Sequence, residues 1–366
     1  MKHQRNQTID CLRFIFAVII VIHHSRSLLG DENCMFLGGS LAVEFFFLVS
    51  GYLMMASVFK KNQSGKSTGT AKETLGFLKR KLYSFYPEVL VAWIVAFAFT
   101  CWALESNSKA IIKRFVDSFS ESLLLYSFGV SWNTVNPATW YLSSMLICMA
   151  ILYPLLRKFP CVMKYLVMPL SALFLLGWLC KNDGHPRNPT KWIGFTYKGN
   201  LRALAELELG VLLFFSAQKI RKIPFNRLGK TLLTIIECCC YAAVVIYMFL
   251  ETPSRRDLFF IGLLCLGISL SFSKQTLLSE LPESKFVFWL GKFSFPLYLS
   301  HQFYAKGLND LLPAVYTNAQ RMVIYLFCSF ATALFVWGFS NLIRRFSKQI
   351  MTTFKHLFLQ ESALTC

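Results

Sequence analysis

Long apolar segments alternate with short polar connections along nearly the whole chain. About 20 helical residues, rising about 1.5 Å each, cross a bilayer core about 30 Å thick, so these segments suit membrane-spanning helices. Segment 121–130 is too short to cross the bilayer and is predicted to be interfacial or re-entrant. We predict ten spans, near residues 10–29, 38–59, 88–105, 138–157, 162–180, 199–217, 231–250, 258–273, 287–305 and 322–343. The pattern therefore indicates an all-α, polytopic membrane helix bundle.

Composition supports a membrane protein. Of the 366 residues, 55% are hydrophobic and 16% charged, whereas soluble domains carry about 25% charged residues. The formal net charge of +19 would suggest a nucleic-acid partner in a soluble protein. Here no nucleic-acid partner is predicted, because topology explains the basic residues. If the N-terminus is inside, the inner connections hold nearly twice as many lysines and arginines as the outer ones, which predicts that both termini are cytoplasmic.

The organisation expected from this topology is simple. Residues 1–345 are predicted to form one transmembrane domain, and residues 346–366 a short cytoplasmic tail. The first span is predicted to be retained, because Asp10 and Arg13 interrupt its apolar run and no signal-peptide cleavage site follows. The twelve cysteines form no C-x-x-C pair and are interpreted as small apolar residues, with a disulfide between Cys34 and Cys180 left open.

Ionisable residues inside the spans are functional candidates, because burying them in lipid is costly. Arg13 and His24 are eleven residues apart, so they project within about 20° of each other on one helix face and lie about 16 Å apart along its axis. His23 is rotated away by about 80°. A cation near the inner mouth and a proton acceptor near the outer one suit a long, phosphate-bearing substrate. The alternative is that these side chains only anchor the helix at the two interfaces.

Other polar residues allow structural interpretations. Arg202 and Glu206 are four residues apart and are predicted to pair with each other. Glu44 lies among phenylalanines and needs either a partner or a proton. Segment 294–296 (SFP) is expected to free backbone groups, which is tolerated where a helix lines a cavity. Trp140 suits either an interfacial anchor or a pocket wall.

Five blocks, in order along the chain, resemble the acyltransferase 3 family of bacterial membrane proteins. Arg13 and His24, with Asp10 just before them, match its arginine-x10-histidine signature. The other matching blocks are residues 39–52 (GSLAVEFFFLVSGY), 77–87 (FLKRKLYSFYP), 140–142 (WYL) and 291–301 (GKFSFPLYLSH). Two positions depart from the pattern: Ser84 stands where many members have an arginine, and Met145 where some have a glutamate.

The resemblance implies O-acylation of a glycan or lipid-linked sugar by an acyl-CoA, with acetyl-CoA favoured, in a bacterial inner membrane. On this hypothesis His24 is the general base and Glu44 holds its imidazole. No metal and no tightly bound cofactor is expected, and the oligomeric state is left open. The coenzyme A phosphates would be bound by Arg13, Lys79, Arg80 and Lys81, and the substrate pocket lined by Trp140, Tyr298 and His301.

Two other functions remain possible from the sequence. A transporter or flippase could move a glycan intermediate without forming a bond, although such proteins typically contain internal repeats and none is visible here. An export component for a polysaccharide could keep the scaffold without its activity. Retention of Arg13, His24 and His301 favours the enzyme.

Overall fold

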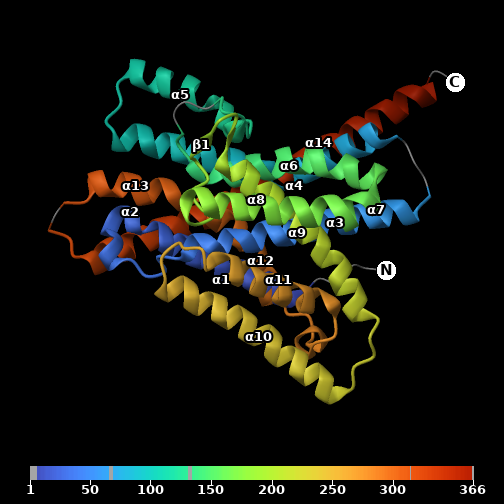
Figure 1. Ribbon diagram of the computed structural model, residues 1–366. Coiled ribbons are helices and arrows are strands. Elements are labelled where there is room, and N and C mark those ends of the chain that lie inside the picture. The colour runs from blue at the N-terminus through green and yellow to red at the C-terminus, as the bar shows by residue number, and fades with distance from the viewer. Residues whose placement is uncertain (1–5, 66–68, 131–133, 314, 365–366) are drawn as a thin grey trace.

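The computed structural model describes residues 6–65, 69–130, 134–313 and 315–364 of the chain, and nearly all of them are helical (Figure 1). The long helices are α1 (Gln7–His24), α3 (Ala42–Gln63), α4 (Thr70–Ala103), α6 (Trp140–Lys158), α8 (Met168–Asp183), α9 (Lys198–Arg221), α10 (Arg227–Leu250), α11 (Asp257–Ser273), α12 (Lys285–Leu299) and α14 (Asn318–Leu364). The shorter elements are α2 (Arg26–Leu29), α5 (Ser108–Ser122), α7 (Pro160–Val162), α13 (Gln302–Leu311) and a small antiparallel hairpin of β1 (Trp192–Ile193) and β2 (Thr196–Tyr197).

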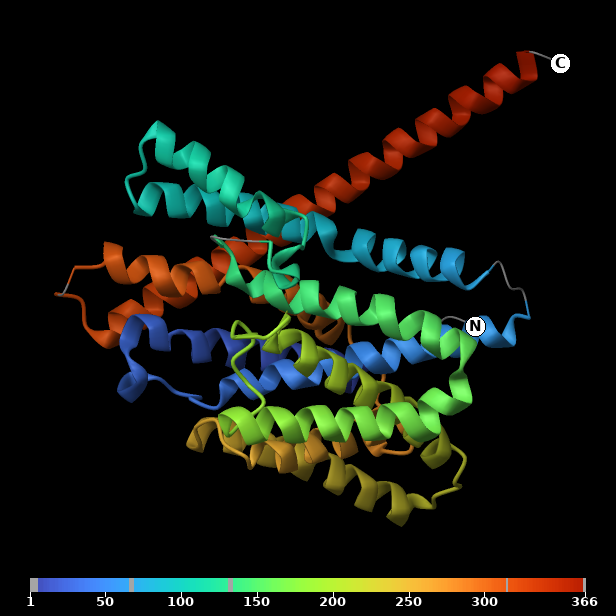
Figure 2. The same cartoon turned by 45° about the horizontal axis from the view of Figure 1, so that its top comes forward.

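The long helices lie roughly side by side, as expected for a polytopic bundle (Figure 1). Elements α2, α5 and α13 lie towards one end of the bundle, while α7 and both chain ends lie towards the other (Figure 1). The C-terminal part of α14 projects away from the other helices (Figure 2). Following the excess of basic residues, we call the end with the chain termini the inner end.

Eight helical segments of the described residues are long and apolar enough to cross a membrane. They account for eight of the ten predicted spans, and the remaining two differ for physical reasons. Helix α9 has 24 residues but carries Arg202, Glu206 and Glu208 in its buried surface. The predicted span 287–305 is wrong as a single helix, because α12 ends at Leu299 and α13 begins two residues after Ser300.

Two further boundaries differ from the sequence prediction. Helix α4 begins at Thr70, well before the predicted span at 88–105. The basic stretch ahead of Pro87 is helical too and forms the first part of the same helix. The segment predicted to be interfacial or re-entrant contains the end of α5 and a 3₁₀ turn, Tyr126–Phe128. Helix α5 has an asparagine cap, Asn107, whose side chain accepts from the backbone N–H of Ala110 at 2.9 Å.

Helix α3 packs against α9 through two glycines. A Cβ on Gly51 would collide with the backbone carbonyl of Leu207, and a Cβ on Gly210 would lie 2.9 Å from the Cα of Gly51. Small residues allow two helix backbones to approach closely within a membrane. This close contact brings the outer halves of both helices together, where their buried charges lie.

Helices α1 and α12 run side by side in the same direction. A Cβ on Gly291 would lie only 2.7 Å from the Cβ of Asp10, so the early turns of both helices touch. At the other end, the rings of His24 and His301 have centroids 5.0 Å apart. The block from Asp10 to His24 and the block 291–301 are therefore neighbours near both of their ends.

Candidate active site

A cavity of about 480 Å³ lies among α1, α3, α4, α6, α12 and α14. Four of its lining residues are cationic: Arg13, Lys81, Lys292 and Arg344. Among the described lining residues, Glu88 is the one carboxylate. Several cations around a concave surface attract a polyanionic ligand and give phosphates charge-assisted hydrogen bonds.

The predicted basic cluster at the start of α4 divides between the cavity and the outside. Lys81 lines the cavity, whereas Lys79 and Arg80 are exposed and are not among its lining residues. Successive helical residues point about 100° apart, so three consecutive cations cannot all face one cavity. Arg13, on α1, also lines the cavity.

Two cations of the cavity were not assigned to the site from the sequence. Arg344, on α14, donates to the backbone carbonyl of Ser84 at 2.8 Å and also pairs with Glu88. Lys292, on α12, lies over the rings of Phe288 and Trp289, 4.6 and 5.2 Å from their centroids. Lys292 belongs to a matched block and so carried a local signal, whereas the position of Arg344 beside α4 depends on tertiary packing alone.

Aromatic side chains close the deep end of the cavity. Tyr141 and Tyr298 both line it, with ring centroids 5.9 Å apart. The hydroxyl groups of Ser50 and Tyr141 are 3.3 Å apart, and Tyr298 donates to the carbonyl of Ala138 at 2.9 Å. Met145, one of the departures from the family pattern, also lines this part. As expected, the proline-containing stretch of α12 borders a cavity.

Three histidines lie beyond Tyr298, towards the outer end. His24 is half-buried, and its ring lies 5.0 Å from that of His301 and 5.2 Å from that of His23. His301 is fully buried, with Nδ1 2.7 Å from the carbonyl oxygen of Tyr298. His23 faces elsewhere: its Nδ1 is 2.9 Å from the carbonyl oxygen of Phe36. Tyr298 thus connects the basic cavity to the histidines.

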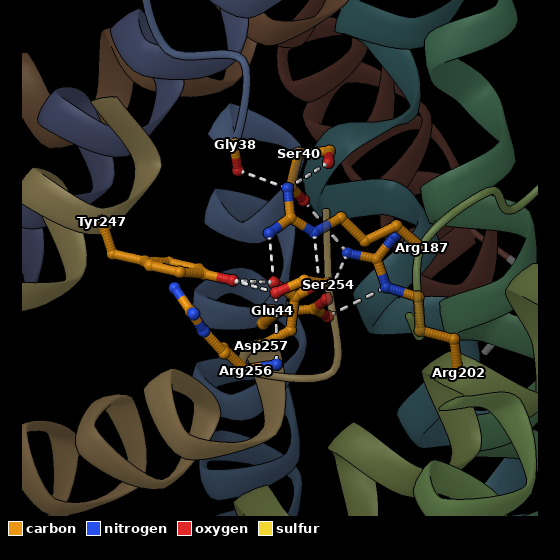
Figure 3. A network of polar contacts seen from close by, with 9 residues as sticks. All are labelled: Gly38, Ser40, Glu44, Arg187, Arg202, Tyr247, Ser254, Arg256 and Asp257. Atoms are coloured by element: carbon orange, nitrogen blue, oxygen red, sulfur yellow. Dashed lines mark hydrogen bonds and ion pairs between the residues drawn. The ribbon is translucent and has the colours of Figure 1, made fainter. Parts of the chain in front are cut away.

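Glu44 lies in a separate buried network (Figure 3). Both of its oxygens accept from Arg202, at 2.6 and 2.9 Å. The predicted pair of Arg202 with Glu206 is confirmed at 3.2 Å, so the guanidinium serves two glutamates. The sequence therefore predicted the local pair but not its partner from α3. In this structure Glu44 meets a guanidinium rather than the imidazole that it was predicted to hold.

A second ion pair fastens the outer loops to the bundle (Figure 3). Arg187 binds Asp257 at 2.5 and 2.7 Å and donates to the carbonyl of Gly38 at 2.7 Å. Tyr247 also donates to Asp257, at 2.7 Å. Since all these groups are buried and hydrogen-bonded to each other, the network is interpreted as structural.

The remaining predicted residues occupy neighbouring positions. Trp140 is buried, packs against Phe47 and Tyr141, and lies 5.7 Å from the guanidinium carbon of Arg202. It is not among the residues that line the cavity. Cys34 and Cys180, whose pairing was left open, are both free thiols.

Fold and site together define a multi-pass membrane protein with a cationic cavity beside a cluster of imidazoles. The sequence model of the acyltransferase 3 family, which is described as an acyltransferase domain, matches residues 6–341, essentially the whole chain. The chain belongs to this family and is an acyltransferase. No curated protein and no solved structure matches the chain.

Proposed function

We propose that this protein transfers an acyl group, in particular acetyl, from an acyl-CoA to a hydroxyl group of a cell-surface glycan or lipid-linked sugar. The proposed cellular location is the inner membrane of a bacterium, and the acyl-CoA donor would enter from the cytoplasm. The observation that supports this most is the cationic cavity at the inner end, continued by Tyr298 towards a histidine pair.

The donor suits this arrangement because its charge and its reactive group are far apart. The phosphates of coenzyme A would be held by Arg13, Lys81, Lys292 and Arg344. The pantetheine arm would extend past Tyr298 towards His24, which lies about 16 Å along α1 from Arg13. A site of this shape holds the thioester and the base together while the charged end stays at the inner mouth.

The proposed chemistry is direct transfer. The acceptor oxygen forms a bond with the thioester carbon while His24 takes the hydroxyl proton. When the carbon–sulfur bond breaks, the proton passes from His24 to the leaving thiolate, so that an ester and free coenzyme A result. General-base assistance of this kind contributes about 10²–10⁴ in rate.

Purified protein in liposomes, given acetyl-CoA labelled in the acetyl group and cell-envelope glycan fractions, tests the proposal. We expect alkali-labile label on the glycan, because oxygen esters are cleaved by base. The His24→Ala protein should transfer label at least about a hundredfold more slowly. Transport without bond formation would instead leave glycan unlabelled by both proteins, and this result would contradict the proposal.

A further inference from the structure

His301 presents a lone pair that has no partner among the described residues. Its Nδ1 is 2.7 Å from the carbonyl oxygen of Tyr298, and a carbonyl only accepts, so Nδ1 carries the proton. Nε2 is then an acceptor, and it is buried without a hydrogen bond to any described group. Leaving a buried polar atom without a hydrogen bond is unfavourable, so an unsatisfied nitrogen in this site calls for a functional reason.

The nearest candidate donor is the imidazole of His24. The two ring centroids are 5.0 Å apart and the ring planes are tilted by 42°, so the imidazoles are neighbours, although no hydrogen bond joins them in this structure. No side-chain hydrogen bond of His24 is found within the described ranges. Glu44 binds Arg202 and Nδ1 of His23 lies 2.9 Å from the carbonyl oxygen of Phe36, so neither side chain is paired with His301.

The two rings also differ in accessibility. His24 is half-buried, whereas His301 has no exposed surface. Of the two rings, His24 is therefore the one with surface through which a substrate could contact it. In sites of the triad type, a buried acceptor behind the accessible imidazole fixes its orientation and supports the imidazolium that forms.

We propose that His301 is the positioning residue for His24: when the His24 ring turns towards it, Nε2 of His301 accepts the ring N–H of His24, leaving the other nitrogen of His24 to take the proton of the acceptor hydroxyl. This inference rests on the proposed function. In the transfer step, the hydroxyl proton goes to His24 and then to the coenzyme A thiolate, while His301 stays neutral and keeps accepting. An imidazole thus takes the part that a carboxylate has in other triads.

The backbone around His301 is held for such a role. At the α12–α13 break, the side chain of Asn136 donates to the carbonyl of Leu299 at 2.8 Å. Asn136 is itself fixed by Glu121, which accepts from the backbone N–H groups of Val135 and Asn136 at 2.9 Å each. These contacts satisfy the backbone freed by the break and fix the position of the imidazole.

His301→Gln and His301→Asn form a matched pair for the test. The glutamine amide reaches the position of Nε2, whereas the asparagine amide reaches only that of Nδ1. We expect His301→Asn to lower kcat by about a hundredfold and His301→Gln by about tenfold or less. Because His301 does not line the cationic cavity, the affinity of both variants for coenzyme A should change less than about twofold.

The proposal would be overturned if both variants lost kcat equally, or if the loss of activity were explained by weaker binding of coenzyme A. Wild-type protein labelled with ¹⁵N-histidine gives a second measurement that needs no variant: a coupling across the hydrogen bond between the two rings is expected, and its absence would also overturn the proposal. If wild-type protein transfers no acetyl label at all, the proposed function itself fails. If the wild-type protein is active and the two variants lose kcat equally, only the role of His301 is rejected.

Discussion

At the scale of single residues, similar cations have different environments. Lys81 and Arg13 line the cavity, whereas Arg80 is exposed beside it. A phosphate contact that is partly shielded from water is worth about 1–3 kcal/mol, while an exposed charge contributes little. The effect of removing a charge should therefore depend on which way its side chain points.

Arg13→Gln is expected to raise the KM for acyl-CoA by about ten- to a hundredfold, at about 1.4 kcal/mol per decade. Steady-state kinetics with acetyl-CoA measures this. Arg80→Gln is the matched control, because it removes the same charge and should leave KM within about threefold. An unchanged KM with a reduced kcat for Arg13→Gln would instead place Arg13 at the reacting atoms.

The two adjacent histidines give a second residue-scale prediction. His24→Ala should lower kcat by at least about a hundredfold, because it removes the proposed base. His23→Ala should retain far more activity, since its ring contacts Phe36 and Gly39 rather than His301. Transfer rates of both purified variants, compared at equal protein, measure the difference. Similar losses would show that the two side chains do not have the separate roles assigned here.

At the scale of elements, the contact between α3 and α9 leaves no room for side chains at its glycines. Gly51→Ala and Gly210→Ala should each lower the unfolding free energy by about 1–3 kcal/mol, because the added methyl group meets backbone rather than a movable side chain. Thermal unfolding of the purified protein in detergent measures the loss. Gly177→Ala in α8 is the control: its Cβ would meet nothing within 4 Å, so stability should stay unchanged or rise. Equal stability of all three variants would show that the close contact is not required.

Elements also show what the sequence could predict. Runs of apolar residues identified most of the spans, since hydropathy is a local property. Spacing on one helix likewise predicted the Arg202–Glu206 pair. The partners of Arg202 on α3 and of Ser84 on α14 could not be predicted, because they are 158 and 260 residues away in the chain. Contacts of this kind depend on how helices pack, which the local pattern does not specify.

The α12–α13 break is an intermediate case. Pro296 and the block that ends at His301 pointed to an irregular stretch next to a cavity, but not to where the helix ends. Its end is determined by groups from elsewhere, including Asn136, which caps the carbonyl of Leu299. Nothing in the local sequence around Glu121 indicated that it holds this loop.

At the scale of the whole molecule, orientation across the membrane decides which substrate meets which end. In a background without native cysteines, a cysteine placed at Thr190 should react with an impermeant thiol reagent from outside. A cysteine at Ser64 should react only after permeabilisation, because it lies at the opposite end of the bundle, in the α3–α4 connection. Both positions are exposed, so access rather than burial limits labelling. The reverse pattern would place the cationic cavity on the outer side.

The buried pair of Glu44 and Arg202 also has a consequence for biosynthesis. The two residues are 158 positions apart, and at about 5–20 residues per second roughly 8–30 s pass between their translation. During that time the first turn of α3 must enter the bilayer with a carboxyl group and no guanidinium, at a cost of up to about 3 kcal/mol. The apolar remainder of α3 has to offset this cost until α9 leaves the ribosome. Stable insertion of α3, which is made first, therefore depends on α9, which is made later.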